Sequence, residues 1–314
     1  MQPSSTCIPS TKGSGEGTYL KLGIKCSSPI CSERSSNCSS TSPCIYSIEY
    51  GDKTTSQGIY GRDRLTLTRS DVIDNFLFGC GTRNSGTFHE LEEDGILGLS
   101  RNPISIVQQT AKKYHQVFSY CIPSKSGFTG FLRFGGGGQE SIIYTPMTNY
   151  KDSSFYGINM IGISVAGKKL PIPSTIFAKG GSIIDSGTDV TRLPRDIYIP
   201  LRDAYRKAMA QYKLVKPEDL GQISELFDTC HFLGRQKSFK FPKVSFILSG
   251  GVAVDIPPSG IYFQVLKTVV CFAFSAKPLD GAPGIIWGSI QQRTLEVVYD
   301  VGKRKIGFGY GACK

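Results

Sequence analysis

Short apolar runs that alternate with polar residues recur along most of the chain from residue 45 onward. Residues 45–50, with the sequence IYSIEY, alternate closely, and Gly51-Asp52 separates them from further apolar runs at 58–60 and 65–67. Because successive side chains of a strand point to opposite faces, such alternation is typical of half-buried strands. The segment therefore predicts a β-hairpin with a long tip.

Comparable runs predict further strands along the rest of the chain. They lie at residues 118–121, 130–134, 155–165, 239–241, 244–246, 269–274 and 295–299. The clearest helix is predicted after Pro194, where apolar residues recur at three- and four-residue steps from Leu201 to Met209. A shorter helix is predicted near Pro103, because the polar residues at 100–102 offer a cap and proline suits an early helical position.

Composition supports a mostly β protein. The 36 glycines and 17 prolines are spread among the apolar runs rather than concentrated in one tract, as many strands joined by tight turns require. A chain of 314 residues can form one large domain or two lobes. Residues 144–154 are polar, and we expect the boundary between two lobes there.

The formal net charge of +11 does not by itself indicate a nucleic-acid-binding protein. The cations are scattered, and no RNA- or DNA-binding signature interleaves them with aromatic residues. The densest group, Lys303-Arg304-Lys305, lies between two strand-like runs and predicts a charged hairpin turn. No apolar stretch is long enough to span a bilayer, so we expect neither a nucleic-acid partner nor a membrane span.

Cysteine usage indicates an oxidising compartment. The ten cysteines include no Cys-x-x-Cys pair, which favours disulfides over a metal site. The sequon that begins at Asn37 agrees with that compartment, although an unmodified polar loop explains it equally well. The first residues have neither a basic nor an apolar region, so we expect no signal peptide in the chain as written.

The most informative stretch is residues 182–188, with the sequence SIIDSGT. An apolar strand leads into Asp185, and Ser186, Gly187 and Thr188 follow it. Glycine lets the backbone turn sharply there, and the two hydroxyls can hydrogen-bond around the carboxylate. An Asp-Ser-Gly tripeptide alone is usually an ordinary turn, so its context decides the interpretation.

The order of several motifs resembles that of the pepsin-like aspartic proteases of family A1. The series is YGD at residues 50–52, DGILGL at 94–99, IDSGT at 184–188, IWG at 286–288, LEVVYD at 295–300 and IGF at 306–308. The FSYC motif at 118–121 and the GAC motif at 311–313 are similar to the plant nepenthesin-type branch. The resemblance covers roughly residues 40–314. It implies a mostly β, bilobal, pepsin-like fold.

The resemblance also implies the roles of individual residues. Asp185 would be the catalytic aspartate of the C-terminal lobe, supported by the rest of its loop. Tyr50 and Gly51 would belong to the flap hairpin that closes over a bound peptide, although Lys53 stands where the family usually has glycine. Trp287 and Ser289 stand where a smaller apolar residue and Asn are usual. Cysteine pairs implied by the resemblance are Cys230 with Cys271 and Cys121 with Cys313.

The first catalytic segment of the family is missing from this sequence. The strand resembling residues 15–23 should continue into an Asp-Thr-Gly before the cysteine-rich loop, but here Lys25 is followed directly by Cys26. Residues 1–44 are then interpreted as a remnant of the pro-segment, N-terminal strand and cysteine-rich loop. Residues 45–148 form an incomplete, truncated N-terminal lobe, and residues 149–314 form the C-terminal lobe.

These features predict an aspartic endopeptidase of the type that hydrolyses peptide bonds at acidic pH with two aspartates, here impaired because one is absent. Its partner would be a polypeptide substrate or peptide-like inhibitor, and it would be a secreted or vacuolar monomer with no cofactor and no metal. One alternative is a catalytically inactive, protease-like protein that binds peptides, inhibitors or glycans. Another is a defective gene product whose full-length relatives are active. A homodimer that joins two Asp185 loops would be obstructed by the remaining N-terminal lobe.

Other catalytic classes are disfavoured by the sequence. No Gly-x-Ser-x-Gly is present, and His89, His115 and His231 lie in polar or mixed surroundings, where we expect surface or partly buried structural roles. The glycines at residues 135–138 are followed by no Gly-Lys-Ser/Thr, and predict a turn after a strand rather than a nucleotide-binding loop.

Overall fold

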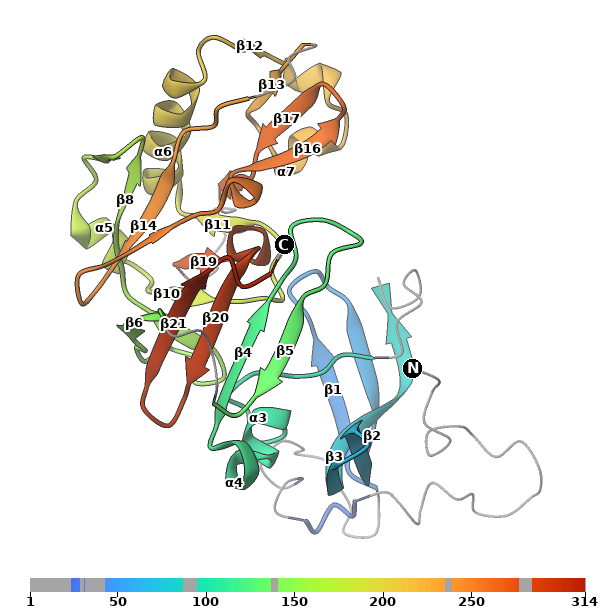
Figure 1. The fold of residues 1–314 in the computed structure, drawn as a ribbon. Coiled ribbons are helices and arrows are strands. Elements are labelled where there is room, and N and C mark those ends of the chain that lie inside the picture. The colour runs from blue at the N-terminus through green and yellow to red at the C-terminus, as the bar shows by residue number, and fades with distance from the viewer. Residues whose placement is uncertain are drawn as a thin grey trace. The chain divides into compact units, whose positions relative to one another are not determined.

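The computed structural model describes residues 24–28, 31, 43–86, 95–136, 141–234, 239–276 and 284–313. Contacts divide the chain into two compact units, which are residues 1–99 with 103–110, and residues 100–102 with 111–314. We call them unit 1 and unit 2. Most elements are strands, so the predicted mostly β fold is confirmed (Figure 1).

Unit 1 contains one three-stranded antiparallel sheet in the order β1-β2-β3. The strands are β1 (Ile45–Glu49), β2 (Thr55–Thr68) and β3 (Asp71–Ser85). The predicted hairpin is confirmed, because β1 and β2 pair from Ile45 with Ile59 to Glu49 with Thr55. Its core is small: Tyr46, Tyr60 and Leu77 pack with three buried cysteines.

The sheet at the centre of unit 2 has five strands in the order β18-β11-β19-β10-β7. Their bounds are β7 (Tyr156–Ile158), β10 (Ser182–Ile184), β11 (Thr191–Leu193), β18 (Phe274–Ala276) and β19 (Ile285–Trp287). Strand β10 runs parallel to β19 and antiparallel to β7. All three residues of β10 are buried, so the strand that precedes Asp185 is rigidly enclosed.

Three further sheets complete unit 2. The second five-stranded sheet contains β4 (Val117–Cys121), β5 (Phe131–Phe134), β6 (Ile143–Pro146), β20 (Leu295–Asp300) and β21 (Lys305–Tyr310), in the order β5-β4-β20-β21-β6. One four-stranded sheet contains β8 (Met160–Val165), β9 (Lys168–Lys169), β14 (Val244–Leu248) and β15 (Val252–Asp255). The other contains β12 (Lys213–Leu214), β13 (Cys230–Phe232), β16 (Tyr262–Leu266) and β17 (Val269–Phe272).

Helices are short except for one. The short ones are α3 (Ile106–Gln109) in unit 1, and α4 (Ala111–Tyr114), α5 (Ser174–Ala178), α7 (Ile223–Leu226), η2 (Pro217–Asp219), η3 (Pro258–Gly260) and η4 (Ser289–Gln292) in unit 2. The long helix α6 (Arg195–Ala208) follows Pro194, as predicted, and buries Ile197, Tyr198, Leu201 and Tyr205.

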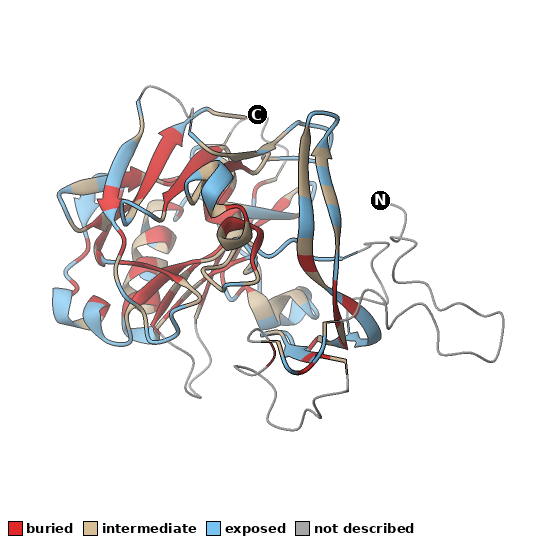
Figure 2. Ribbon diagram, turned by 90° about the horizontal axis from the view of Figure 1, so that it is seen from below, coloured by how far each residue is buried: buried red, intermediate tan, exposed pale blue. Residues whose placement is uncertain are grey.

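The core of unit 2 is aromatic. Trp287 is fully buried, stacks on Phe308 at 4.9 Å and meets the edge of Phe246 at the same centroid distance. The large side chain at this position is therefore accommodated by two neighbouring rings. Figure 2 shows buried residues along most strands of unit 2, whereas β2 and β3 of unit 1 are largely intermediate or exposed.

Several local expectations differ from the structure. Residues 239–241 were predicted as a strand but do not form one. The next strand, β14, begins at Val244. The short helix α3 is capped by Ser105, whose hydroxyl accepts from the Gln108 N–H at 3.3 Å, rather than by residues 100–102. The charged turn is confirmed, since residues 301–304 connect β20 and β21. The two compact units are defined by contacts within the structure, whereas the boundaries at residues 44 and 148 were placed from the sequence. Those two boundaries stay predictions.

Some expectations fall outside the described residues. They are the strand near Tyr19, the sequence that leads into Lys25, the sequon at Asn37 and the surroundings of His89.

Candidate functional site

The Asp185 loop begins where a buried strand ends. Strand β10 is enclosed between β7 and β19, and Ile184 pairs with Trp287. The Asp185 N–H continues this ladder and donates to the Trp287 carbonyl at 3.0 Å. The carboxylate is therefore carried by a fixed backbone while its own side chain is only half-buried.

Both carboxylate oxygens of Asp185 accept a hydrogen bond from within the loop. The Gly187 N–H donates to Oδ1 at 2.9 Å, and the Thr188 hydroxyl donates to Oδ2 at 2.8 Å. Ser186 and Gly187 are exposed. A carboxylate that is held in this way and open to solvent can position a water or exchange a proton with it.

A second backbone segment lies directly against the loop. The Ser289 N–H donates to the Thr188 carbonyl at 2.7 Å, and the Ile290 N–H donates to the Asp189 carbonyl at 2.9 Å. A Cβ at Gly288 would lie 2.7 to 2.8 Å from backbone atoms of residues 188–190. Such a contact is too short for a real side chain, so glycine is required at residue 288 for the two segments to touch.

A buried polar network supports the loop from below, and the sequence did not reveal it. The Gln292 side chain donates to the Trp287 carbonyl at 2.8 Å and to the Asp185 carbonyl at 3.4 Å. Its amide oxygen accepts from the Tyr120 hydroxyl, which lies 3.1 Å from the Tyr299 hydroxyl. Tyr120 belongs to the FSYC motif at residues 118–121, which in the sequence indicates only the family. Its connection to the Asp185 loop through Gln292 is visible only in the structure.

The network's phenols stay neutral over a wide pH range. Burial raises the pKa of Tyr120, and the negative charge of Asp185 adds to that shift. Burial likewise raises the pKa of Tyr299, with further increases from Tyr120, Tyr156 and Asp185. Both hydroxyls therefore remain available as hydrogen-bond donors in acid and at neutral pH.

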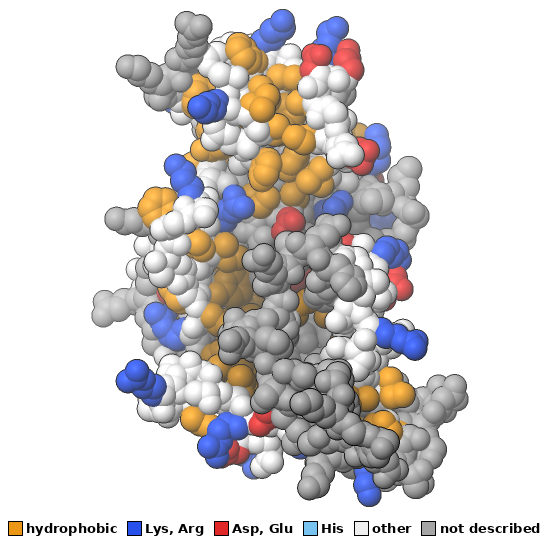
Figure 3. Space-filling view, turned by 90° about the vertical axis from the view of Figure 1, so that its right-hand side faces the viewer, with side chains coloured by type: hydrophobic (Ala, Val, Ile, Leu, Met, Phe, Trp, Pro, Cys, Tyr) orange, Lys and Arg blue, Asp and Glu red, His pale blue; other side chains and the backbone are white. Residues whose placement is uncertain are grey.

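An apolar cluster adjoins the same loop. Val190 packs with buried residues of β13 and β17, and partly buried side chains cover this cluster. The covering residues are Val215, Leu220, Ile223, Leu226 and Val265. In the face shown in Figure 3, hydrophobic side chains gather over the upper part of the molecule.

Tyr50 lies at the tip of the β1–β2 hairpin in unit 1. Its N–H donates to the Thr54 carbonyl at 2.8 Å, and the Lys53 N–H donates to the Tyr50 carbonyl at 3.0 Å. The Asp52 carboxylate closes the turn by accepting from the Thr54 N–H and hydroxyl at 3.0 and 2.8 Å. Lys53 has a φ of 69°. That left-handed conformation suits glycine, which explains the family's preference at this position.

The predicted site residues thus fall into two groups. Asp185, Ser186, Gly187 and Thr188 share one turn of unit 2, whereas Tyr50 and Gly51 belong to unit 1. Over the described ranges, no three His, Cys, Asp or Glu side chains are grouped as a metal site would require. No helix of the described chain is long and apolar enough to cross a membrane.

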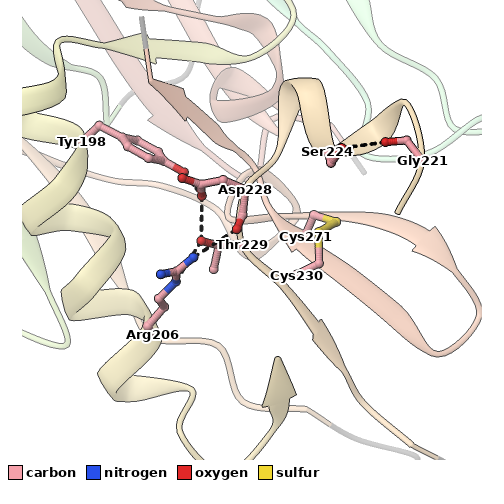
Figure 4. Close-up of a disulfide and its surroundings, with 8 residues drawn as sticks. All are labelled: Tyr198, Arg206, Gly221, Ser224, Asp228, Thr229, Cys230 and Cys271. Atoms are coloured by element: carbon pink, nitrogen blue, oxygen red, sulfur yellow. Dashed lines mark hydrogen bonds between the residues drawn. A yellow bond between two sulfur atoms is a disulfide. The ribbon is translucent and has the colours of Figure 1, made fainter. Parts of the chain in front are cut away.

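The structure pairs the cysteines as the resemblance implies. Cys121 is bonded to Cys313 and Cys230 to Cys271, while a third bond joins Cys31 to Cys44. Cys26 and Cys80 are disulfide-bonded as well. Figure 4 shows the Cys230–Cys271 bond between adjacent strands, next to a polar cluster around Asp228.

Comparison with known sequence families gives two matches. The family described as Xylanase inhibitor N-terminal matches residues 5–136, and the family described as Xylanase inhibitor C-terminal matches residues 155–310.

Solved structures share the fold. Basic 7S globulin from soybean superposes with a TM-score of 0.72 at 19% identity, covering 96% of this chain and 83% of that chain. Conglutin gamma from lupine seeds gives a TM-score of 0.71 at 20% identity, over 92% of this chain and 82% of its own. At this level of identity the likeness concerns the fold alone.

Curated relatives are plant aspartyl proteases. An aspartyl protease family protein of Arabidopsis thaliana is 42% identical over 92% of this chain and 61% of the relative. Aspartyl protease AED1 of the same plant is 39% identical over 97% of this chain and 63% of the relative. The chain thus spans about three fifths of the length of these two relatives.

Aspartic proteinase nepenthesin-1 of Nepenthes gracilis is 30% identical over 99% of this chain and 71% of its own length. Together with the fold and the motif order, this match decides the family. The chain belongs to the pepsin-like aspartic proteases of peptidase family A1, in the plant branch that includes nepenthesin-1.

Proposed function

We propose that this chain is part of an aspartic-type endopeptidase in which Asp185 supplies one of two catalytic carboxylates. The observation that carries the proposal is the Asp185 side chain, which stands half-exposed at the end of a buried strand with both oxygens fixed by its own loop. We further propose that the chain by itself hydrolyses peptide bonds poorly.

The impairment follows from the chemistry of paired carboxylates. One carboxylate must be ionised to activate water while its neighbour is protonated to polarise the peptide carbonyl, and like charges in close contact make this sharing favourable in acid. Asp185 is the one aspartate in the sequence that is followed by Ser or Thr and then Gly. A single carboxylate cannot fill both roles.

The substrate would be a polypeptide. The partly buried apolar side chains that cover the cluster beside Val190 offer a surface for the side chains of an extended peptide. The disulfides fit an extracellular or vacuolar compartment, which is oxidising or acidic enough for this chemistry. We propose a monomer as the functional form.

The test is cleavage of an unfolded protein substrate between about pH 3 and 6, the range in which two coupled carboxylates share a proton, with and without a statine-type inhibitor. The chain is compared with Asp185→Asn and with Asp189→Asn, a nearby exposed aspartate whose backbone carbonyl makes the contact with Ile290. We expect all three to show equally low cleavage. Inhibitor-sensitive cleavage by the unmodified chain that Asp185→Asn abolishes would refute the impairment.

A gain-of-function variant tests Asp185 itself. Inserting the first Asp-Thr-Gly segment of a relative between Lys25 and Cys26 should produce inhibitor-sensitive cleavage in acid. Adding Asp185→Asn to that insertion should remove the cleavage, whereas adding Asp189→Asn should not. Cleavage that survives Asp185→Asn would show that Asp185 is not catalytic.

A second candidate function is binding without catalysis. It is favoured by the single Asp-Ser-Gly motif and by the matching families, whose description is that of xylanase inhibitors. Dose-dependent inhibition of a secreted plant or fungal glycanase by the unmodified chain, unchanged in Asp185→Asn, would support this function over proteolysis.

A further inference from the structure

The net positive charge of the protein comes from unit 2. Residues 100–102 and 111–314 carry 27 Lys and Arg against 14 Asp and Glu, a net charge of +13. The rest of the chain carries 9 Lys and Arg against 11 Asp and Glu, a net charge of −2. Unit 2 alone would therefore attract anionic partners, because summed surface charge raises their local concentration.

Part of that charge gathers at one end of the sheet that contains β4, β20 and β21. Helix α4 leads directly into β4, and the turn between β20 and β21 lies against this junction (Figure 1). The Val301 N–H donates to the Gln116 carbonyl at 3.1 Å, and Asp300 pairs with Val117. The cations brought together here are Lys112, Lys113, Lys303, Arg304 and Lys305, which we call the basic end.

Among the described residues, Asp300 and Asp152 are acidic groups that lie beside the basic end. Asp300 is buried, accepts from the Lys303 N–H at 2.9 Å and lies 3.8 Å from the Lys303 ammonium. Asp152, in the neighbouring loop, accepts from the N–H and hydroxyl of Ser154 at 2.8 and 2.6 Å. Arg304 reaches that loop and donates to Asn149 at 2.8 Å. The five cations of the basic end thus outnumber these two carboxylates within the described part of the chain.

Aromatic rings lie among the cations. The Lys305 ammonium stands 3.9 Å from the centroid of the exposed Tyr144 ring, and the Lys113 ammonium stands 5.6 Å from that of Tyr114. Tyr114 in turn stacks on Phe134 at 5.4 Å. Such rings present flat apolar faces beside positive charge, a combination that suits a sugar ring carrying a carboxylate.

We propose that the basic end binds an acidic polysaccharide built of uronic acid units. Carboxylates along the glycan would meet the lysines and Arg304, and sugar faces would lie on the exposed tyrosine. The disulfides favour an oxidising compartment, which separates the chain from nucleic acids and from the anionic cytoplasmic leaflet of membranes. This binding is independent of the Asp185 site.

The test is affinity electrophoresis of the whole chain in gels containing polygalacturonic acid. One triple variant, Lys112→Gln with Lys303→Gln and Arg304→Asn, removes charge from the basic end, and Asn suits the left-handed conformation of Arg304, whose φ is 51°. The control, Lys207→Gln with Lys213→Gln and Lys267→Gln, removes the same charge from exposed positions on α6, β12 and the β16–β17 turn.

We expect the first variant to bind at least about tenfold more weakly and the control less than about twofold, since each surface cation contributes separately to binding an anionic surface. Binding should also weaken between about 50 and about 200 mM salt. Equal losses in both variants would overturn the proposal, because net charge alone would explain them. The proposal would also be overturned if the unmodified chain did not bind polygalacturonic acid. It would be overturned as well if the chain bound fully methyl-esterified pectin, which lacks the charge, as tightly as polygalacturonic acid. Tighter binding to phosphatidylserine vesicles through the same residues would reassign the surface to lipid.

Discussion

His231 is the residue whose environment departs most from expectation. The sequence predicted a surface or partly buried histidine, but its side chain is 1% exposed in β13. It lies edge-on to the Tyr205 ring at 5.6 Å, and its Nδ1 has no hydrogen-bond partner among the described residues. Burial disfavours the imidazolium, and Arg206 adds positive charge nearby, so the pKa of His231 is lowered to about 4.

This burial predicts a loss of stability in weak acid. In the unfolded chain His231 binds a proton below a pKa of about 6.5, whereas in the folded chain it stays neutral until the pH falls to about 4. The contribution of His231 is thus complete above pH 6.5 and declines as the pH falls to about 4. Between pH 7 and 4 the unmodified chain should lose roughly 3 kcal/mol more free energy of unfolding than His231→Gln, measured by urea denaturation.

The comparison depends on the difference between pH values, so a general loss of stability in His231→Gln does not affect it. His115→Gln is the matched control, because His115 is exposed. Identical pH dependence in all three proteins would show that His231 can be protonated in the folded state.

At the scale of elements, helix α6 is tied to the strand that carries Cys230. Tyr198 donates to the Asp228 carboxylate at 2.5 Å, and Arg202 reaches its other oxygen at 3.3 Å (Figure 4 shows the tyrosine). Arg206 donates to the Asp228 carbonyl and to the Thr229 hydroxyl, each at 3.0 Å. Three successive turns of the helix thus contact one pair of residues next to the disulfide.

The carboxylate of Asp228 is expected to stabilise this connection. Burial alone raises its pKa, but hydrogen bonds from Tyr198, Thr229 and Arg202 outweigh burial and the pKa is lowered. The Asp228 carboxylate therefore adds its full contribution to the free energy of unfolding above its unfolded pKa near 4. That contribution is lost as the pH falls through the lower pKa of the folded state. At pH 7, Asp228→Asn should reduce the free energy of unfolding by about 1 to 2 kcal/mol.

Asp203→Asn is the control for this prediction. Asp203 also pairs with Arg202, at 2.9 Å, but it is exposed, so its loss should cost less than about 1 kcal/mol. Equal stability of the two variants would mean that the contacts of Asp228 do not hold α6 to the strand.

At the scale of the whole molecule, the two units differ in how much apolar surface they bury. Unit 1 leaves large apolar side chains exposed, including Ile45 at 58%, Ile96 at 57% and Leu97 at 44%. The core cluster of unit 1 holds six buried residues, three of which are cysteines. Few apolar contacts therefore hold this unit together.

Limited trypsin digestion should therefore remove unit 1 first. We expect early cuts at exposed cations of β2 and β3, such as Arg62 and Arg83, and a lasting fragment that begins near Lys112 or Lys113. Local opening is less costly where few apolar contacts must be broken. Mass spectrometry of the fragments identifies the order, and a unit 1 that resists as long as unit 2 would contradict the expectation.

Sequence alone was sufficient for elements whose pattern is local. Alternation around Ile45 and the helical spacing after Pro194 each predicted an element that the structure contains. The motif order predicted the family and with it the pepsin-like fold. Residues 239–241, Phe-Lys-Phe, alternate like a strand but do not form one, because a short alternating segment becomes a strand only where a neighbouring strand pairs with it.

What the sequence determined by itself is the chemistry of the Asp-Ser-Gly loop, because glycine and two hydroxyls beside an aspartate restrict how that turn can close. Only the tertiary structure revealed what holds the loop, since Tyr120 and Gln292 lie 172 residues apart in the sequence and meet through hydrogen bonding. Burial of His231 and the basic end are likewise decided by packing. Contacts between distant segments depend on which strands become neighbours, and no local pattern encodes that choice.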